Sequence, residues 1–190
     1  TAGAGTTVSA NYAVDTALPV VAIAISDSAL KAGDTATVTF TFSEPVTGFG
    51  NAGVTVANGT LGAVASVDGG LTWTAAFTPD AGATDASNLV TVDNTGYLDA
   101  AGNCGIGLTS AAAYAIDTAR PTVAVALSDS TLLAGETSVV TFTFSEAVTG
   151  FTSADVTVSN GTLGTPVSVD GGLTWSATLT PAQGVTAAAN

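Results

Sequence analysis

The chain has 190 residues, of which fifteen are acidic and only two, Lys31 and Arg120, are basic, so its net charge at neutral pH is −13. Nucleic acid is excluded as a partner, because phosphate binding requires a basic surface. The chain contains no histidine, which removes the commonest general base and the Ser/His/Asp and Cys/His catalytic sets. We therefore expect a protein that is not an enzyme. No apolar run approaches the ~20 residues of a membrane span, so no membrane insertion is expected.

The sequence repeats itself with a spacing of 102 residues. Residues 15–88 align with residues 117–190, and 49 of these 74 pairs are identical. The chain is therefore interpreted as a tandem repeat. Residues 15–116 are predicted to be a complete repeat, and residues 117–190 a second repeat that is truncated at its C-terminal side. Residues 1–14 end in NYAV, and NYAVDT at residues 11–16 is similar to AYAIDT at residues 113–118, so we interpret residues 1–14 as the last strand of a preceding repeat.

The apolar residues of each repeat alternate with polar ones, which indicates extended strands with one apolar face. The clearest case is TATVTFTFSEPVTGF at residues 35–49, which returns as TSVVTFTFSEAVTGF at residues 137–151. Turn signals such as Asn58-Gly59 separate the strands. The predicted fold class is all-β, with tandem immunoglobulin-like β-sandwich repeats arranged end to end. The strands expected in the first repeat are residues 20–26, 35–42, 54–57, 61–67, 71–78, 89–92 and 108–116.

Three segments of the first repeat are predicted to be irregular: a turn at residues 26–34, a link at residues 79–88, and the long polar loop DNTGYLDAAGN at residues 93–103. If each turn reverses the chain, the loops fall at two opposite ends of the sandwich. One end is expected to carry Asp15, Glu44, Asp68 and the loop 93–103. The other end is expected to carry Asp27, Asp34, Asp80, Asp85 and Asp117.

Several motifs resemble the bacterial Ig-like domains that are repeated in very large surface adhesins, including those exported by type I secretion with RTX tails. The motifs are DTALP and DTARP, AGDTATVTFTFSEPVTGF, VDGGLTWTAAFTP, and DAAGN before a final YAID. The resemblance implies an extracellular or cell-surface protein with a role in cell adhesion and biofilms. It also implies sandwiches strung end to end, with calcium at or near the joints between repeats and a ligand-binding tip held away from the cell.

Calcium takes about six to eight oxygen ligands from carboxylates, carbonyls, amides and water. At the joint before the first repeat, the loops can supply Asp15, Glu44, Asp99 and Asn103. This oxygen-only set suits Ca²⁺ and does not suit Zn²⁺, which prefers His and Cys. The alternative is that these residues are solvated turn acids, a position that Asp and Asn favour in any protein.

At the joint between the repeats, Asp117 and Glu146 match the first two of these residues, and Asp27 of the first repeat is a further candidate ligand. Asp68 and Asp170 each precede a Gly-Gly pair and are predicted to be turn formers. Trp73 and Trp175 alternate with threonines, which predicts core packing in preference to a sugar-stacking platform. The outward threonine rows are interpreted as ordinary strand residues in preference to an ice-binding array.

These observations favour a structural extender module of a large bacterial surface or secreted adhesin, rigidified by Ca²⁺ at its joints and in contact with neighbouring repeats of the same chain. Two alternatives stay open. One is a self-assembling extracellular filament or surface-layer subunit, with other copies as partners. The other is a glycan- or protein-binding Ig-like module, although loops that hardly differ between the two repeats favour repetition for length.

Overall fold

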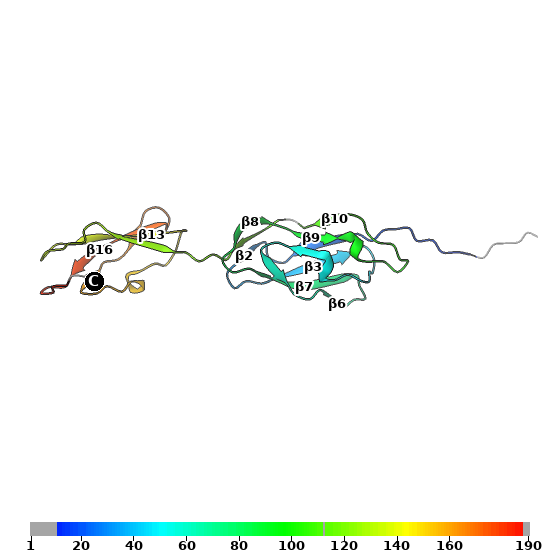
Figure 1. Ribbon diagram of the computed structural model, residues 1–190, viewed down its shortest axis with the longest axis horizontal. Helices are drawn as coiled ribbons and strands as arrows, with labels where there is room; N and C mark the ends of the chain where they lie inside the picture. Colours follow the sequence, from blue (N-terminus) through cyan, green and yellow to red (C-terminus); the bar gives the residue numbers. More distant parts are fainter. Residues whose placement is uncertain (1–10, 112, 188–190) are drawn as a thin grey trace, which may run out of the picture. The chain divides into compact units, whose positions relative to one another are not determined.

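A computed structural model describes residues 11–111 and 113–187, which divide between Ala119 and Arg120 into two compact units (Figure 1). The described residues contain strands and three short 3-10 turns, which confirms the all-β prediction. None of their helical segments has the length and apolar character needed to cross a membrane. Of the predicted strand in residues 1–14, residues 1–10 lie outside the described part, and residues 11–14 form no strand.

The larger sheet of the first unit is antiparallel, and its central strand is the alternating segment that dominates the sequence. In β3 (Ala36–Phe42) the threonines are exposed or partly exposed, whereas the apolar residues that alternate with them are buried: Ala36, Val38, Phe40 and Phe42. This is the outcome expected when one face of a strand packs on a core. The sheet order is β1 (Val21–Ile25), β3, β7 (Thr72–Pro79) and β5 (Gly59–Leu61), and β6 (Ala65–Ser66) also pairs with β7.

Two three-stranded sheets form the rest of the first unit. One has the order β10 (Leu108–Ser110), β9 (Val90–Asp93) and β4 (Val54–Val56). The other has the order β2 (Ala29–Lys31), β11 (Tyr114–Asp117) and β8 (Thr84–Asn88), in which β11 runs parallel to β2 and antiparallel to β8. Side chains from all three sheets meet in one hydrophobic core.

The strand predictions need four corrections. The predicted strand at residues 61–67 is divided between the end of β5 and the short β6, each of which pairs separately with β7. The predicted turn at residues 26–34 contains β2, and the predicted link at residues 79–88 contains β8. The predicted strand at residues 108–116 is divided into β10 and β11, which belong to different sheets. The sequence does not reveal β2 and β8 because they exist as the two hydrogen-bonded neighbours of β11 and have little apolar pattern of their own.

The described residues of the second unit repeat the larger sheet of the first. Its order is β12 (Val123–Leu127), β13 (Ser138–Phe144), β16 (Thr174–Pro181) and β14 (Gly161–Leu163), with β15 (Val167–Ser168) also paired to β16. Among the residues described, Phe151 and Val156 pack on this sheet, but no second sheet covers it. Val123 is consequently 50% exposed, whereas its counterpart Val21 in the first unit is 8% exposed.

Aromatic side chains make up much of the core beneath the acidic end of the first unit. Trp73 is partly buried and packs edge-on against Phe49, with 5.6 Å between ring centroids, and its indole N–H donates to the carbonyl of Gly70. Trp175 makes the same contact with Phe151 in the second unit. Core packing of both tryptophans is confirmed, so neither presents a flat ring for sugar stacking.

Candidate metal centre

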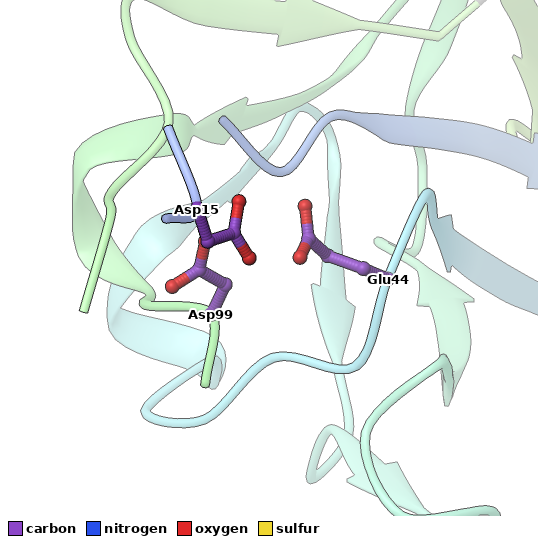
Figure 2. A group of neighbouring side chains, drawn as sticks. All are labelled: Asp15, Glu44 and Asp99. Atoms are coloured by element: carbon purple, nitrogen blue, oxygen red, sulfur yellow. The ribbon is translucent and has the colours of Figure 1, made fainter. Parts of the chain in front are cut away.

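Three predicted ligands meet at one end of the first unit. Asp15 lies in the extended segment before β1, Glu44 lies two residues after β3, and Asp99 lies in the loop after the 3-10 turn η2 (Asn94–Gly96). One carboxylate oxygen from each lies within 4.8 Å of the other two. Figure 2 shows Glu44 pointing toward Asp15 and Asp99 from the opposite side of the group. We call these three residues the acidic triad.

Asp99 is the most rigidly held member of the acidic triad. It is 4% exposed, and its Oδ1 accepts hydrogen bonds from the backbone N–H groups of Ala101 and Asn103, each at 2.8 Å. The amide nitrogen of Asn103 donates to Asp99 Oδ2 at 2.8 Å and to the backbone carbonyl of Asp15 at 3.4 Å. Asn103, predicted as a ligand, therefore acts in this geometry as a donor that orients Asp99 and links it to the linker segment.

Glu44 is placed by contacts on both sides of its loop. The Ser43 hydroxyl oxygen accepts a hydrogen bond from the Val20 N–H at 3.1 Å, and the Ser43 N–H donates to the Val20 carbonyl at 2.9 Å. Thr47 and Leu98 exchange two backbone hydrogen bonds, at 2.8 and 3.0 Å. Because Leu98 precedes Asp99, this bridge fixes the loop of Glu44 against the loop of Asp99.

The turn of Asp68 was expected at this end of the unit, but sequence reasoning did not identify the contact that its Gly70 makes with the loop of Glu44. Its carbonyl accepts a hydrogen bond from the Val46 N–H at 3.0 Å, and its φ is +100°. The corresponding contact in the second unit joins Gly172 and Val148, also at 3.0 Å. The signal that could have revealed it is the identity of the VDGGLTW segment in both repeats, which marks a turn that tolerates little change.

The electrostatics of the acidic triad are those of a site lacking positive charge. Desolvation raises the pKa of Glu44 above its ordinary value of 4.5, and the negative charges of Asp99 and Asp15 raise it further. For Asp99, burial is the largest single influence and opposes ionisation, but the hydrogen bonds from Asn103, Ala101 and Gly102 together outweigh it and lower the pKa below 3.8. Asp99 is thus held as an anion while Glu44 resists ionisation beside it.

In calcium-free buffer, lowering the pH from neutrality toward 4.5 is expected to stabilise the first unit. The folded state binds a proton at Glu44 at a higher pH than the unfolded chain does, so the free energy of unfolding rises as the pH falls through that window. Below about pH 3.8 protonation of Asp99 has the opposite effect. Because the pKa of Asp99 is lower in the folded state, the free energy of unfolding falls as the pH falls. Thermal unfolding across this range, compared between the natural chain and Glu44→Gln, measures the effect. Identical pH profiles for the two proteins would contradict it.

The remaining predicted ligands stay predictions. Asp27 Oδ1 accepts the N–H of Ala29 at 2.9 Å, and Asp117 Oδ1 accepts the hydroxyl of Thr84 at 3.1 Å, so each has a hydrogen-bond partner within the first unit. Glu146 lies in the second unit, where Ser145 Oγ accepts the N–H of Thr122 at 2.9 Å just as Ser43 does for Val20. The backbone contact beside Glu44 is therefore repeated beside Glu146.

Two other predictions about acidic residues are confirmed. Asp68 Oδ1 accepts hydrogen bonds from the Thr72 N–H at 2.9 Å and from the Ser66 hydroxyl at 2.8 Å, and Asp170 makes the same pair of contacts in the second unit. Both residues are turn formers. On the side of Asp117, the sheet registers place Lys31 and Thr84 opposite Asp117, which agrees with the expected position of the nearby Asp34 and Asp85.

The β-sheets and the acidic loop end define a pair of immunoglobulin-like modules in tandem. The model of the bacterial Ig-like domain matches residues 15–116 and again residues 117–190. The chain belongs to the bacterial Ig-like domain family. Members of this family are generally non-enzymatic structural modules and are typically extracellular or surface-exposed. A search among curated proteins gave no match.

Proposed function

We propose that this chain is an extender segment of a large bacterial adhesin at the cell surface or in the secreted fraction, and that Ca²⁺ bound at its joints makes the array stiff. The acidic triad is the observation that carries the proposal. Asp15 belongs to the segment that leads into the first repeat, whereas Glu44 and Asp99 belong to loops of the repeat itself. A cation held by all three would fasten the linker to the domain.

The chemistry of the triad favours a hard divalent cation. Its donors are carboxylate oxygens, with the carbonyl of Asp15 also close to the loop of Asp99, and the described group contains neither sulfur nor imidazole. Without a cation, three like charges whose oxygens lie within 4.8 Å of one another repel one another. A bound cation attracts all three carboxylates to one centre, and the linker can then no longer rotate freely. The function is therefore mechanical, and it requires no bound substrate.

Removal of calcium is expected to lower the melting temperature of the first unit and to shorten the particle measured by small-angle X-ray scattering. A ligand that binds only the folded state at about 100 times its Kd stabilises it by about 2.7 kcal/mol. The measurements compare the chain in excess calcium with the chain in a chelator at the same ionic strength. Superimposable melting and scattering curves would refute calcium at the joint.

The double substitution Glu44→Gln with Asp99→Asn is expected to reproduce the chelated behaviour in the presence of calcium, because it removes two of the three carboxylates while keeping their shape. A matched control is Asp34→Asn with Asp80→Asn, which removes the same charge from the opposite end of the unit. Calorimetric titration with calcium should show weakened binding in the first variant alone. Full retention of calcium by Glu44→Gln/Asp99→Asn would place the ligands elsewhere.

A further inference from the structure

The outward face of the larger sheet in the first unit is built from small uncharged side chains. Exposed positions alternate with buried ones in β3 and in β7, which lies beside it (Figure 1). The register continues these positions across the sheet, because Thr39 pairs with Ala24 on one side and with Thr74 on the other. We call this surface, and its counterpart in the second unit, the threonine face. In the first unit it consists of Ala22, Ala24, Thr37, Thr39, Thr41, Thr60, Ala65, Thr72, Thr74, Ala76 and Thr78.

The second unit presents the same face on its own larger sheet. Of the 74 aligned pairs of residues, 49 are identical, which leaves 25 differences between the repeats. The differences that fall on the threonine face exchange only alanine, threonine, serine and valine, so none of them introduces a charge. The counterpart residues are Ala124, Ala126, Val139, Thr141, Thr143, Thr162, Val167, Thr174, Ser176, Thr178 and Thr180.

Charged side chains are absent from the strands that carry the threonine faces. All strands of the two larger sheets lie in the described part of the chain, and none of them contains an acidic or basic residue. The strands of the smaller sheets, in contrast, contain Lys31, Asp85, Asp93 and Asp117. Two copies of a chain with a net charge of −13 repel each other wherever their carboxylates approach. The threonine face allows two copies to touch without bringing carboxylates together.

The chemistry of the threonine face is complementary to itself. A hydroxyl group both donates and accepts hydrogen bonds, so a row of threonines can pair with an identical row on another copy. The threonine methyl groups and the alanines of β1 and β12 are apolar and small, which allows two sheets to approach closely. Sheets that pack face to face in this way keep their strand directions within about 30° of each other. Two chains joined by these faces would therefore lie side by side.

The size of the threonine face determines how strong this contact can be. Strand β3 has seven residues and is one of four strands across the sheet. With strands about 4.8 Å apart and a rise of about 3.3 Å per residue, the face covers roughly 400 Å². Two such faces bury roughly 800 Å² together, which is less than the ~1,200 Å² at which stable specific interfaces begin. One pair of repeats is thus expected to associate weakly, and the association should strengthen as more repeats engage.

We propose that the threonine faces are a contact surface between copies of this chain, through which neighbouring chains associate side by side. The partner is a second copy because only an uncharged, hydroxyl-rich and equally flat surface matches this face, and each repeat supplies one. The proposal concerns contacts between chains and therefore goes beyond the mechanical role of the array. It does not depend on a cation at the acidic triad, whose residues lie in loops outside the larger sheet.

Sedimentation velocity in a chelator, over a wide range of chain concentration and at low and high NaCl, tests the proposal. The natural chain is expected to be monomeric when dilute and to form reversible dimers and larger species when concentrated. Added salt should strengthen the association, because it screens the repulsion between two acidic chains and leaves an uncharged contact intact. Association that weakens as salt is added would indicate an interface of ion pairs and would overturn the proposal.

Substitutions on the threonine face identify the surface. Thr74→Asp with Ser176→Asp places one carboxylate in each face, at exposed positions of β7 and β16. Like charges that meet across an interface are strongly repulsive, so we expect the association to weaken by at least about tenfold. The matched control is Thr55→Asp with Thr157→Asp, which adds the same charge at exposed threonines outside the threonine face. The control should associate like the natural chain.

A charge-reversed variant separates loss of contact from loss of folding. Thr74→Lys with Ser176→Lys should also associate weakly by itself. Its mixture with Thr74→Asp/Ser176→Asp should associate more strongly than either variant alone, because opposite charges then face each other. A natural chain that is monomeric at every concentration would overturn the proposal. So would association undiminished in the aspartate variant, which would place the contact on another surface, or a mixture no stronger than its components.

Discussion

Replacement of Tyr97 by alanine is expected to destabilise the first unit by about 3–5 kcal/mol, the usual cost of removing a buried aromatic ring. Tyr97 is 1% exposed, and its ring packs edge-on against Phe42 and Phe49 at centroid distances of 4.8 and 5.9 Å. It lies two residues before Asp99, so its loss should also release the loop that positions the acidic triad. We therefore expect Tyr97→Ala to lose stability and calcium response together.

The matched variant Tyr97→Phe keeps the ring and removes the hydroxyl, which donates to Asn94 Oδ1 at 3.1 Å. We expect it to cost only about 1 kcal/mol, the net contribution of one hydrogen bond. Denaturant unfolding followed by fluorescence in a Trp175→Phe background reports on Trp73 and hence on the first unit alone. A cost for Tyr97→Ala no larger than that of Tyr97→Phe would show that the ring is not a supporting element of the core.

The second large effect is expected from Gly70→Ala. The φ of +100° at Gly70 disfavours any side chain, and a Cβ atom there would collide with the backbone carbonyl of Val46. The loop that carries Glu44 would have to move away from the turn. We expect a loss of stability greater than the roughly 1–2 kcal/mol that left-handed backbone alone costs an L-residue, and a weakened response to calcium.

Gly69→Ala separates the two causes, since Gly69 has a φ of +80° but no atom lies within 4 Å of the place its Cβ would take. It should show the conformational cost without the collision. Gly172→Ala should behave in the second unit as Gly70→Ala does in the first, because Val148 faces it in the same way. Thermal unfolding and calcium titration of the three variants measure these effects. Equal losses of stability for Gly69→Ala and Gly70→Ala would mean that the loop of Glu44 can move away from the new Cβ at no cost in stability.

The sequence predicts the fold class because its strongest signals are local. The alternation in β3 and the exact return of the turn VDGG require no knowledge of distant contacts, and they locate β3 and β7 and their counterparts β13 and β16. The convergence of Asp15, Glu44 and Asp99 also follows from local information, since it depends only on the reversal of the chain at each turn.

The parts that sequence reasoning missed are those fixed by tertiary contacts. In β2 only Leu30 faces the core, and β8 is the polar segment TDASN, so neither has a recognisable pattern before β11 pairs with it. The division of residues 108–116 into two strands cannot be seen locally either, because apolar and polar residues alternate in both halves. Tyr97 was hidden for a different reason, since its loop is polar in composition but its ring is buried.

The position of β11 also determines how the module responds to tension. The strand lies between β2 and β8, and Asp117 at its end leads directly into the second unit. A force transmitted along the polypeptide pulls β11 lengthwise, so its hydrogen bonds to both neighbours are sheared at the same time instead of opening in sequence. The two small strands that look least important in the sequence would then act as the clamp that keeps β11 in its sheet under load.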